Sequence, residues 1–98
     1  MTYGIRDLYM DDLQHKVLKG GEEIYLTPLE YKILRLLMME GGKVIPSGTI
    51  YQTVWEMEPF GYENTVAVHI RHIRDKIEEN PSKPQYLKLI RGFGYCVA

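Results

Sequence analysis

The most constraining feature of this sequence is one strongly periodic stretch, residues 64–79. At about 100° per residue, its branched aliphatic side chains fall on one stripe of a helix: Val66, Ile70, Ile73 and Ile77. Such a stripe has to be buried, so the sequence predicts a firmly held helix of about 14 residues. We expect Thr65 or Asn64 to cap its start and Asn80-Pro81 to end it.

The rest of this helix surface is polar and basic. It presents a mixture of small, charged and hydrogen-bonding side chains: Ala67, Val68, His69, Arg71, His72, Arg74, Asp75 and Lys76. Charge at helical spacing usually marks a solvated face. A held helix with an arginine-rich outer face can also enter the major groove of DNA. The other segments of the sequence distinguish between these two interpretations.

Length and charge limit the possible functions. Ninety-eight residues with 45% hydrophobic content suffice for one domain with one core, without disulfides or metal. The net charge of −1 argues against a protein that binds nucleic acid through bulk charge. The charge is unevenly distributed, however, because residues 1–63 hold six Lys/Arg against ten Asp/Glu, and residues 64–98 hold six against three. The positive third of the chain contains the periodic helix.

The sequence favours a cytoplasmic protein. Its single cysteine, Cys96, excludes an internal disulfide and fits a reducing compartment. No apolar run approaches the roughly 18 residues of a membrane span, and the first residues lack the apolar core of a signal peptide. We therefore expect no membrane association.

Two segments have the pattern of β structure. Residues 4–26 are short apolar clusters broken by turn formers, which is typical of a small antiparallel sheet. Gly20-Gly21 tolerates positive φ and marks a hairpin within this sheet. At the other end, residues 86–90 and 95–97 form two predicted strands around the turn 91–94.

Two further helices precede the basic one. Thr27-Pro28-Leu29-Glu30 predicts a helix start, with Thr27 as N-cap, proline in the first turn and Glu30 closing a capping box. This helix should end at Gly41-Gly42. We expect Ser47 to cap a second helix that ends at about residue 55 or 56. The loop that follows, residues 57–63, is longer than the turn of a tight helix-turn-helix.

Sheet, three helices and C-terminal hairpin is the order of an α+β winged helix-turn-helix, in which the hairpin is the wing. Four motifs now resemble the effector domain of OmpR/PhoB-type response regulators: Thr27-Pro28-Leu29-Glu30-Tyr31, Val54-Trp55, Thr65-Val66-x-Val68-His69-Ile70-Arg71-x-Ile73-Arg74 and Arg91-Gly92-x-Gly94-Tyr95. The resemblance covers nearly the whole chain from about Gly4. It implies a transcription regulator of a two-component phosphorelay.

The resemblance also implies how DNA is bound. The helix at about 65–79 would lie in the major groove and the wing at 91–94 in the adjacent minor groove. Carried over, the DNA-binding positions are Trp55, Asn64, Thr65, Ala67, Val68, His69, Arg71, His72, Arg74, Arg91 and Gly92. Many members have arginine where this chain has Asn64 and His72, and aspartate where it has Ala67. The preferred DNA sequence should therefore differ from theirs.

Physical chemistry supports these roles without the family. An arginine can pair bidentately with guanine, or with phosphate without reading sequence, and the pattern leaves open which helix arginine reads a base. Arg91 beside Gly92 has the reach and backbone freedom to enter a narrow minor groove.

Several partners follow from the resemblance. Members pair head to tail on direct repeats of double-stranded DNA, so we expect a monomer alone and pairs on DNA. They contact RNA polymerase through the loop before the third helix, where Glu58, Phe60 and Glu63 are the candidate residues. Members normally carry an N-terminal receiver domain that a cognate histidine kinase phosphorylates. Residues 1–98 form a single effector domain without that receiver, either excised or stand-alone.

Other functions are less well supported. His69 and His72 could approach one metal ion, but no further ligand stands at a suitable spacing. Cys96 is more typical of a core thiol than of a nucleophile. Glu56 and Glu58 lie in or beside an exposed loop without a pocket pattern, so we expect neither an enzyme nor a cofactor. The alternative is a winged-helix module for protein contact without specific DNA binding, which the acidic first two-thirds of the chain would favour.

Overall fold

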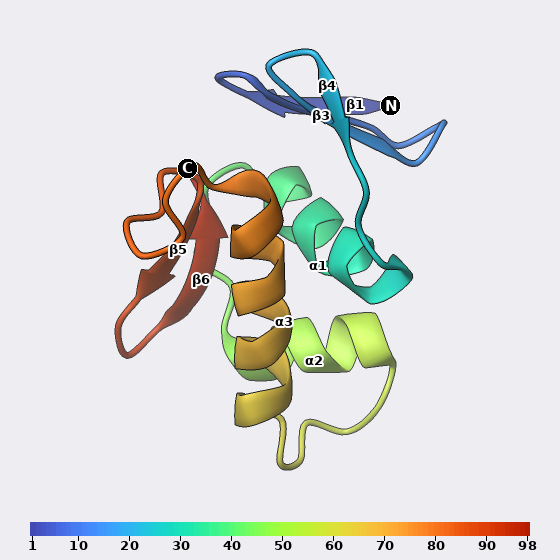
Figure 1. Ribbon diagram of the computed structural model, residues 1–98. Helices are drawn as coiled ribbons and strands as arrows, with labels where there is room; N and C mark the ends of the chain where they lie inside the picture. Colours follow the sequence, from blue (N-terminus) through green and yellow to red (C-terminus); the bar gives the residue numbers. More distant parts are fainter.

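The computed structural model describes all 98 residues. Along the chain, three helices follow an N-terminal sheet and precede a C-terminal hairpin, and Figure 1 shows the sheet above α1 and the hairpin beside α3. The sheet consists of β1 (Thr2–Ile5), β2 (Leu8–Asp11), β3 (Lys16–Lys19) and β4 (Glu22–Ile24). The other elements are α1 (Pro28–Met39), α2 (Ser47–Trp55), α3 (Glu63–Ile77), β5 (Leu87–Ile90) and β6 (Gly94–Val97). This order confirms the expected α+β winged helix. None of the helices combines the length and apolar character needed to cross a membrane.

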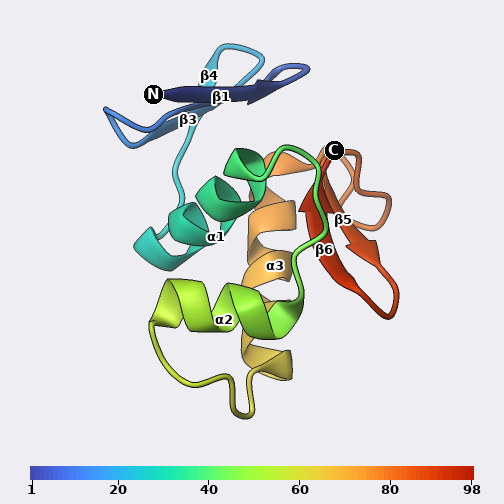
Figure 2. The ribbon, with the colours of Figure 1, turned by 180° about the vertical axis from the view of Figure 1, so that it is seen from behind.

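The N-terminal strands form one antiparallel sheet in the order β1-β2-β3-β4, which lies as a layer over α1 (Figure 2). The predicted hairpin is confirmed, since Gly20 and Gly21 join β3 to β4 with φ values of 57° and 84°. Alternate side chains of β2 and β3 are buried in the core: Leu8, Met10 and Val17. One face of the sheet therefore packs on the helices, and the other meets solvent.

The start of α1 is as predicted. The Thr27 hydroxyl accepts a hydrogen bond from the Glu30 backbone N–H at 3.3 Å, and the Glu30 carboxylate accepts one from the Thr27 N–H at 2.9 Å. This reciprocal pair satisfies two donors that a helix start leaves unpaired. The helix ends before Gly41, whose φ of 61° turns the chain away.

The predicted cap of α2 is wrong. Ser47 is the first residue inside the helix, and the N-cap is Pro46, which makes no side-chain cap. Proline with ψ at 147° already holds the chain extended before the first turn. Gly48 packs closely on the loop that follows α2, since a Cβ there would lie 3.3 Å from the Tyr62 side chain and would require that ring to shift slightly.

The bounds of α3 also differ from the prediction. The helix begins at Glu63, so neither Asn64 nor Thr65 is its cap, and the N-cap Tyr62 makes no side-chain hydrogen bond. At the other end, Glu78 is already extended. Its carboxylate binds backbone N–H groups of residues 85–87, which explains why the helix stops before the Asn-Pro pair.

The predicted stripe of α3 is confirmed as the centre of the core. Its four branched side chains are at most 1% exposed: Val66, Ile70, Ile73 and Ile77. They belong to one cluster of 19 buried residues drawn from every helix, both sheets and the α1–α2 link. The helix is therefore fixed along its length by apolar contact.

The wing is tied to the α1–α2 link. Ile45 pairs with Tyr95 through two backbone hydrogen bonds of 2.8 and 3.0 Å, and so extends the β5–β6 hairpin. A Cβ on Gly94 would overlap the backbone of Ile45 and Pro46. Only glycine permits this close approach.

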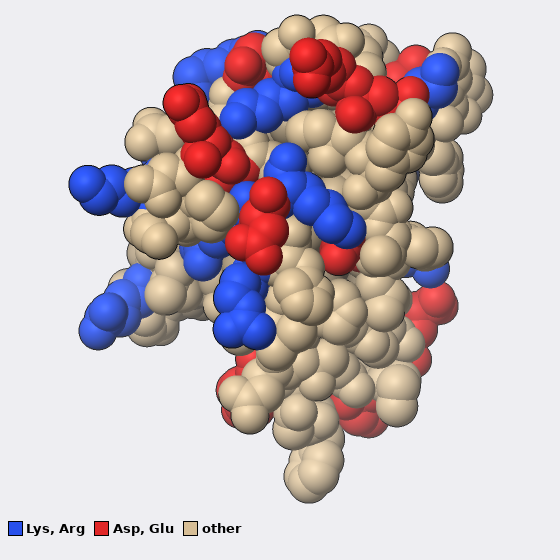
Figure 3. All heavy atoms as spheres, viewed as in Figure 1, with Lys and Arg blue, Asp and Glu red and all other residues tan.

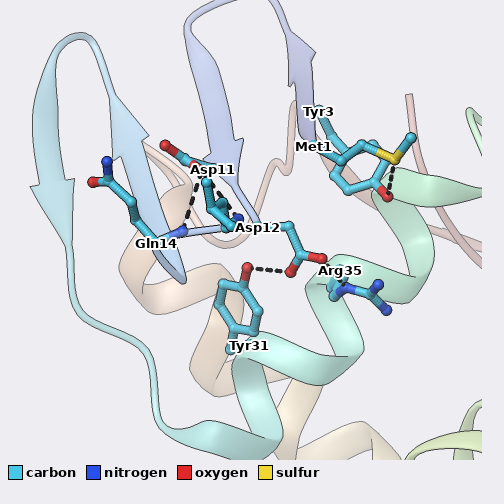
Figure 4. Close-up of polar contacts among 8 residues, drawn as sticks. Met1, Tyr3, Asp11, Asp12, Gln14, Tyr31 and Arg35 are labelled. Atoms are coloured by element: carbon cyan, nitrogen blue, oxygen red, sulfur yellow. Dashed lines mark hydrogen bonds and ion pairs between the residues drawn. The ribbon is translucent and has the colours of Figure 1, made fainter.

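Polar contacts hold the N-terminal sheet on α1. The Asp12 carboxylate accepts hydrogen bonds from the Tyr31 hydroxyl at 2.7 Å and from Arg35 Nε at 2.8 Å (Figure 4). The hydrogen bonds from Arg35 and then from Tyr31 lower the pKa of Asp12. Burial and the bond to Asp12 raise the pKa of Tyr31.

A second ion pair joins α1 to α3. Lys76 Nζ lies 2.5 Å from Glu30 Oε1, and the Glu30 side chain is 4% exposed. Burial disfavours the charged form of Glu30, but the hydrogen bonds from Lys76 and Thr27 outweigh it and lower the pKa of this carboxyl. Glu30 therefore serves both the capping box and the helix contact.

We expect Glu30→Gln to reduce the free energy of unfolding at neutral pH by about 1–2 kcal/mol, because it weakens the cap and the ion pair. The Glu30 pKa is lower in the folded chain than its ordinary value of 4.5. The ionised Glu30 carboxylate thus stabilises the folded chain fully above pH 4.5, and this stabilisation is lost as the pH falls through the lowered pKa. Urea denaturation followed by circular dichroism should show the two chains converging as the medium is acidified. If the difference in unfolding free energy between the two chains did not change with pH, the ionised Glu30 carboxylate would not be its source.

Candidate nucleic-acid interface

The outer face of α3 is free of the core. The predicted candidates Asn64, Ala67, Val68, Arg71 and His72 are all exposed there. The Arg71 guanidinium has no ion pair or hydrogen bond within the chain. Because the buried stripe fixes the helix on its opposite side, this face offers a rigid arrangement of donors, acceptors and one unpaired cation.

The start of this face is organised around His69. Its Nδ1 lies 2.8 Å from the Thr65 carbonyl oxygen. Since a carbonyl only accepts, Nδ1 carries the proton, and Nε2 of the neutral ring is left as an acceptor. The Trp55 ring at the end of α2 meets His69 at 5.2 Å between centroids in an edge-to-face contact, and His72 follows at 6.4 Å. The structure thus brings together three candidates from two helices.

The two helix arginines differ in their surroundings. Arg74 is half-buried, and its Nε donates a hydrogen bond of 3.0 Å to the Leu87 carbonyl oxygen in β5. Its guanidinium also lies 6.0 Å from the centre of the Tyr95 ring in β6. Arg74 therefore spans the space between α3 and the wing, whereas Arg71 projects freely. Sequence spacing alone could not separate them.

The wing turn presents the predicted arginine. Arg91 and Gly92 are exposed, and Gly92 has a φ of 83°. Phe93 beside them is 73% exposed. A hollow of about 320 Å³ separates the wing turn from the first turns of α2 and α3. Neither first turn has a side-chain cap, so its backbone N–H groups can donate to an anion.

Charge on the wing is one-sided, although the exposed acids Asp75 and Glu79 lie on or beside α3. Residues 80–98 contain Lys83, Lys88 and Arg91 and no acidic side chain. The charged side chains that project furthest over the wing in Figure 3 are accordingly Lys and Arg, whereas Asp and Glu lie over the N-terminal sheet, over α3 and towards the bottom of the view. The wing and α3 together form the face best suited to a polyanion.

The loop between α2 and α3 divides into an outward and an inward part. Glu58 is exposed, and Phe60 is 89% exposed. Tyr62 instead turns inward, with its ring 6.1 Å from that of Tyr51. Glu63, predicted to be part of the loop, is the first residue of α3. The loop therefore forms an accessible surface along its length, apart from Tyr62.

Sequence analysis missed the polar side chains that orient this site. Glu78 is 6% exposed and holds the start of β5, although nothing in its sequence neighbourhood distinguished it from other helix-end acids. Cys96 is buried, as expected for a core thiol. No group of three or more His, Cys, Asp or Glu side chains is suitably placed to hold a metal ion.

Known proteins with similar sequences and folds are transcription regulators. The family described as "Transcriptional regulatory protein, C terminal" matches residues 21–97. Regulatory protein VanRc of Enterococcus gallinarum is 39% identical over 83 residues, which is 85% of this chain and 36% of VanRc. The OmpR/PhoB homologue DrrB of Thermotoga maritima has a TM-score of 0.88 and 33% identity, covering 99% of this chain and 44% of DrrB. The RstA DNA-binding domain of Klebsiella pneumoniae, in complex with the RstA box, has a TM-score of 0.91 and 25% identity, covering 99% and 96%.

Proposed function

The chain belongs to the family of C-terminal domains of transcriptional regulatory proteins, and we propose that it binds double-stranded DNA as the effector domain of an OmpR/PhoB-type response regulator. In this proposal α3 lies in the major groove and the wing turn in the adjacent minor groove. The proposal is supported chiefly by the unpaired Arg71 on the outer face of a rigidly held helix, together with an exposed Arg91 on a wing without acidic residues. The family is one of regulators and not of enzymes.

The proposed contacts divide into two kinds. Arg71, His72 and Asn64 are exposed on the outer face of α3, and we propose that they meet base edges, where hydrogen bonds read sequence. Lys88 and the uncapped first turns of α2 and α3 suit phosphate, which adds affinity without sequence information. Arg91 suits a narrow minor groove, where the negative potential is greatest.

The intact protein is proposed to be longer. This chain spans less than half the length of VanRc and of DrrB. We therefore propose that an N-terminal receiver domain, phosphorylated by a cognate histidine kinase, accompanies this effector domain in the cytoplasm. Phosphorylation would then control DNA binding by a domain that is folded on its own.

Arg71→Ala and Arg91→Ala should both weaken binding to a duplex selected from random sequence. If Arg71 pairs with a base, its loss should reduce the free energy of DNA binding by about 1–3 kcal/mol and relax the preference for that base at one position of the site. Loss of Arg91 should also reduce the slope of log affinity against log salt by about 1 if it neutralises phosphate. Fluorescence anisotropy titrations at several salt concentrations measure both effects.

Lys16→Ala is the matched control, because it removes one positive charge from the N-terminal sheet, away from the proposed interface. It should leave affinity nearly unchanged. Equal affinity of the Arg71 variant and the parent for every duplex would instead favour the alternative, a winged-helix module for protein contact.

We further propose that two copies bind head to tail on direct repeats, although one copy alone is a monomer. A single small module buries only about 600–1,000 Å² on DNA, so a second copy about one helical turn away adds needed contact. Mobility shifts should give tighter binding to a duplex with two half-sites than to one with a single half-site. Equal affinity for both duplexes would exclude cooperative pairing.

The first half of the α2–α3 loop is proposed to contact RNA polymerase. An exposed acid and an almost fully exposed aromatic side chain, Glu58 and Phe60, support this role. A carboxylate would repel the DNA backbone, whereas an exposed aromatic side chain is typical of protein interfaces. Glu63 is part of the same proposal. It is also the first residue of α3, where the helix dipole favours a negatively charged side chain.

Replacing Glu58 and Phe60 together by alanine should reduce transcription from a target promoter several-fold and leave DNA affinity intact. Neither side chain contributes to the core, so stability should stay within about 0.5 kcal/mol. In vitro transcription and anisotropy on the same protein separate the two activities. Tyr62→Ala is an unsuitable variant, since its ring supports α2. Full activation by the double variant would disprove polymerase contact here.

A further inference from the structure

We propose that Glu78 is a positioning residue, whose carboxylate fixes the wing against α3 so that Arg91 and the helix meet DNA together. This inference rests on the proposed DNA-binding function. Glu78 contacts no DNA in this scheme; it acts through the backbone of β5.

The Glu78 carboxylate binds three consecutive backbone N–H groups. Gln85 and Leu87 donate to it at 2.7 and 2.8 Å, and Tyr86 donates to both oxygens at 3.3 and 3.1 Å. The residue itself is only 6% exposed. A carboxylate suits this place because it offers only acceptors, and hydrogen bonds to a charged group are the stronger ones.

Other contacts also reach the start of the wing, since Arg6 donates to the Gln85 carbonyl oxygen and the Tyr86 hydroxyl donates to Asp7, but it is Glu78 that accepts from the N–H groups of residues 85–87. No Lys or Arg pairs with Glu78, so its buried charge is held by amide donors. The preceding loop bonds mainly within itself, since Lys83 and Ser82 donate to the carbonyl and side-chain oxygens of Asn80. Removal of the carboxylate would leave donors of residues 85–87 unpaired, which is costly in a buried place.

Arg74 completes the attachment from one turn earlier. Residues four apart lie on the same helix face, so Arg74 and Glu78 reach the same strand. Glu78 accepts from the Leu87 N–H, and Arg74 donates to the Leu87 carbonyl. Strand β5 is thereby tied to α3, whereas β6 is tied to the α1–α2 link through Ile45. These two ties, together with the hydrogen bonds from Arg6 to the Gln85 and Ala98 carbonyl oxygens, orient the wing.

The wing turn magnifies small changes at this attachment. Arg91 is four residues beyond Leu87, or about 13 Å along an extended strand. A rotation of roughly 10° at the base would move the turn by about 2 Å, enough to break a hydrogen bond in the groove. Glu78→Gln should release the base, because its amide nitrogen cannot accept from the facing N–H groups.

The test is a double-mutant cycle for DNA affinity with the parent, R91A, E78Q and the double variant. Measurements are made at a temperature where circular dichroism shows all four folded. We expect R91A to weaken specific binding about tenfold in the parent and less than about threefold in the E78Q background. A merely structural role for Glu78 would lower the melting temperature without changing the Arg91 effect.

Asp12→Asn is the matched control. It also converts a carboxylate to an amide, and Asp12 joins the end of β2 to Tyr31 and Arg35 of α1 without contacting the wing. In the Asp12→Asn background, R91A should weaken specific DNA binding as much as it does in the parent. If E78Q does not fold, Glu78→Asp shortens the side chain with its charge kept and should also reduce the R91A effect. An undiminished R91A effect in the Glu78 variant overturns this inference alone. No R91A effect in the parent overturns the wing's proposed contact with DNA, and this inference with it.

Discussion

Burial of one face of α3 is the constraint on which the rest of the structure depends. An isolated helix of this length is marginal in water, so its stability has to come from packing. Four branched side chains at most 1% exposed contribute on the order of 6–12 kcal/mol of apolar burial. Because that packing uses one stripe completely, the opposite face needs no side chains for stability. The outward residues are therefore free to serve binding.

Helix α3 also orients α1 and the wing, through polar side chains that lie between its buried stripe and its exposed face. Lys76 pairs with Glu30 at the start of α1, and Arg74 and Glu78 hold the first strand of the wing. Three polar side chains at the end of α3, two within the helix and one just after it, thus relate α3 to two other elements. Substitutions at such edges would change both stability and geometry, whereas substitutions at Arg71 affect only what approaches from outside.

Local signals predicted the features that local physics determines: the capping box at Thr27, the glycine hairpin, the α3 stripe and its exposed face. The misses share a different origin. Glu30 and Lys76 are 46 residues apart, and Asp12 and Arg35 are 23 apart, so no periodicity relates them. The cap at Ser47 failed because the preceding proline had already set the backbone. Arg74 resembled Arg71 in sequence, and only the position of the wing distinguishes their environments.

The sparse charge of the interface has its own consequence for specificity. Each phosphate neutralised adds affinity to all sequences alike, and this nonspecific term grows with the number of cations. Many members of the family have arginine where this chain has Asn64 and His72, so this helix presents fewer permanent charges. Asparagine can still pair bidentately with adenine, and a neutral imidazole can accept or donate. In the proposed complex, this face would lose nonspecific attraction more than base recognition, and a second copy on DNA would add more to its affinity than to that of a more basic helix.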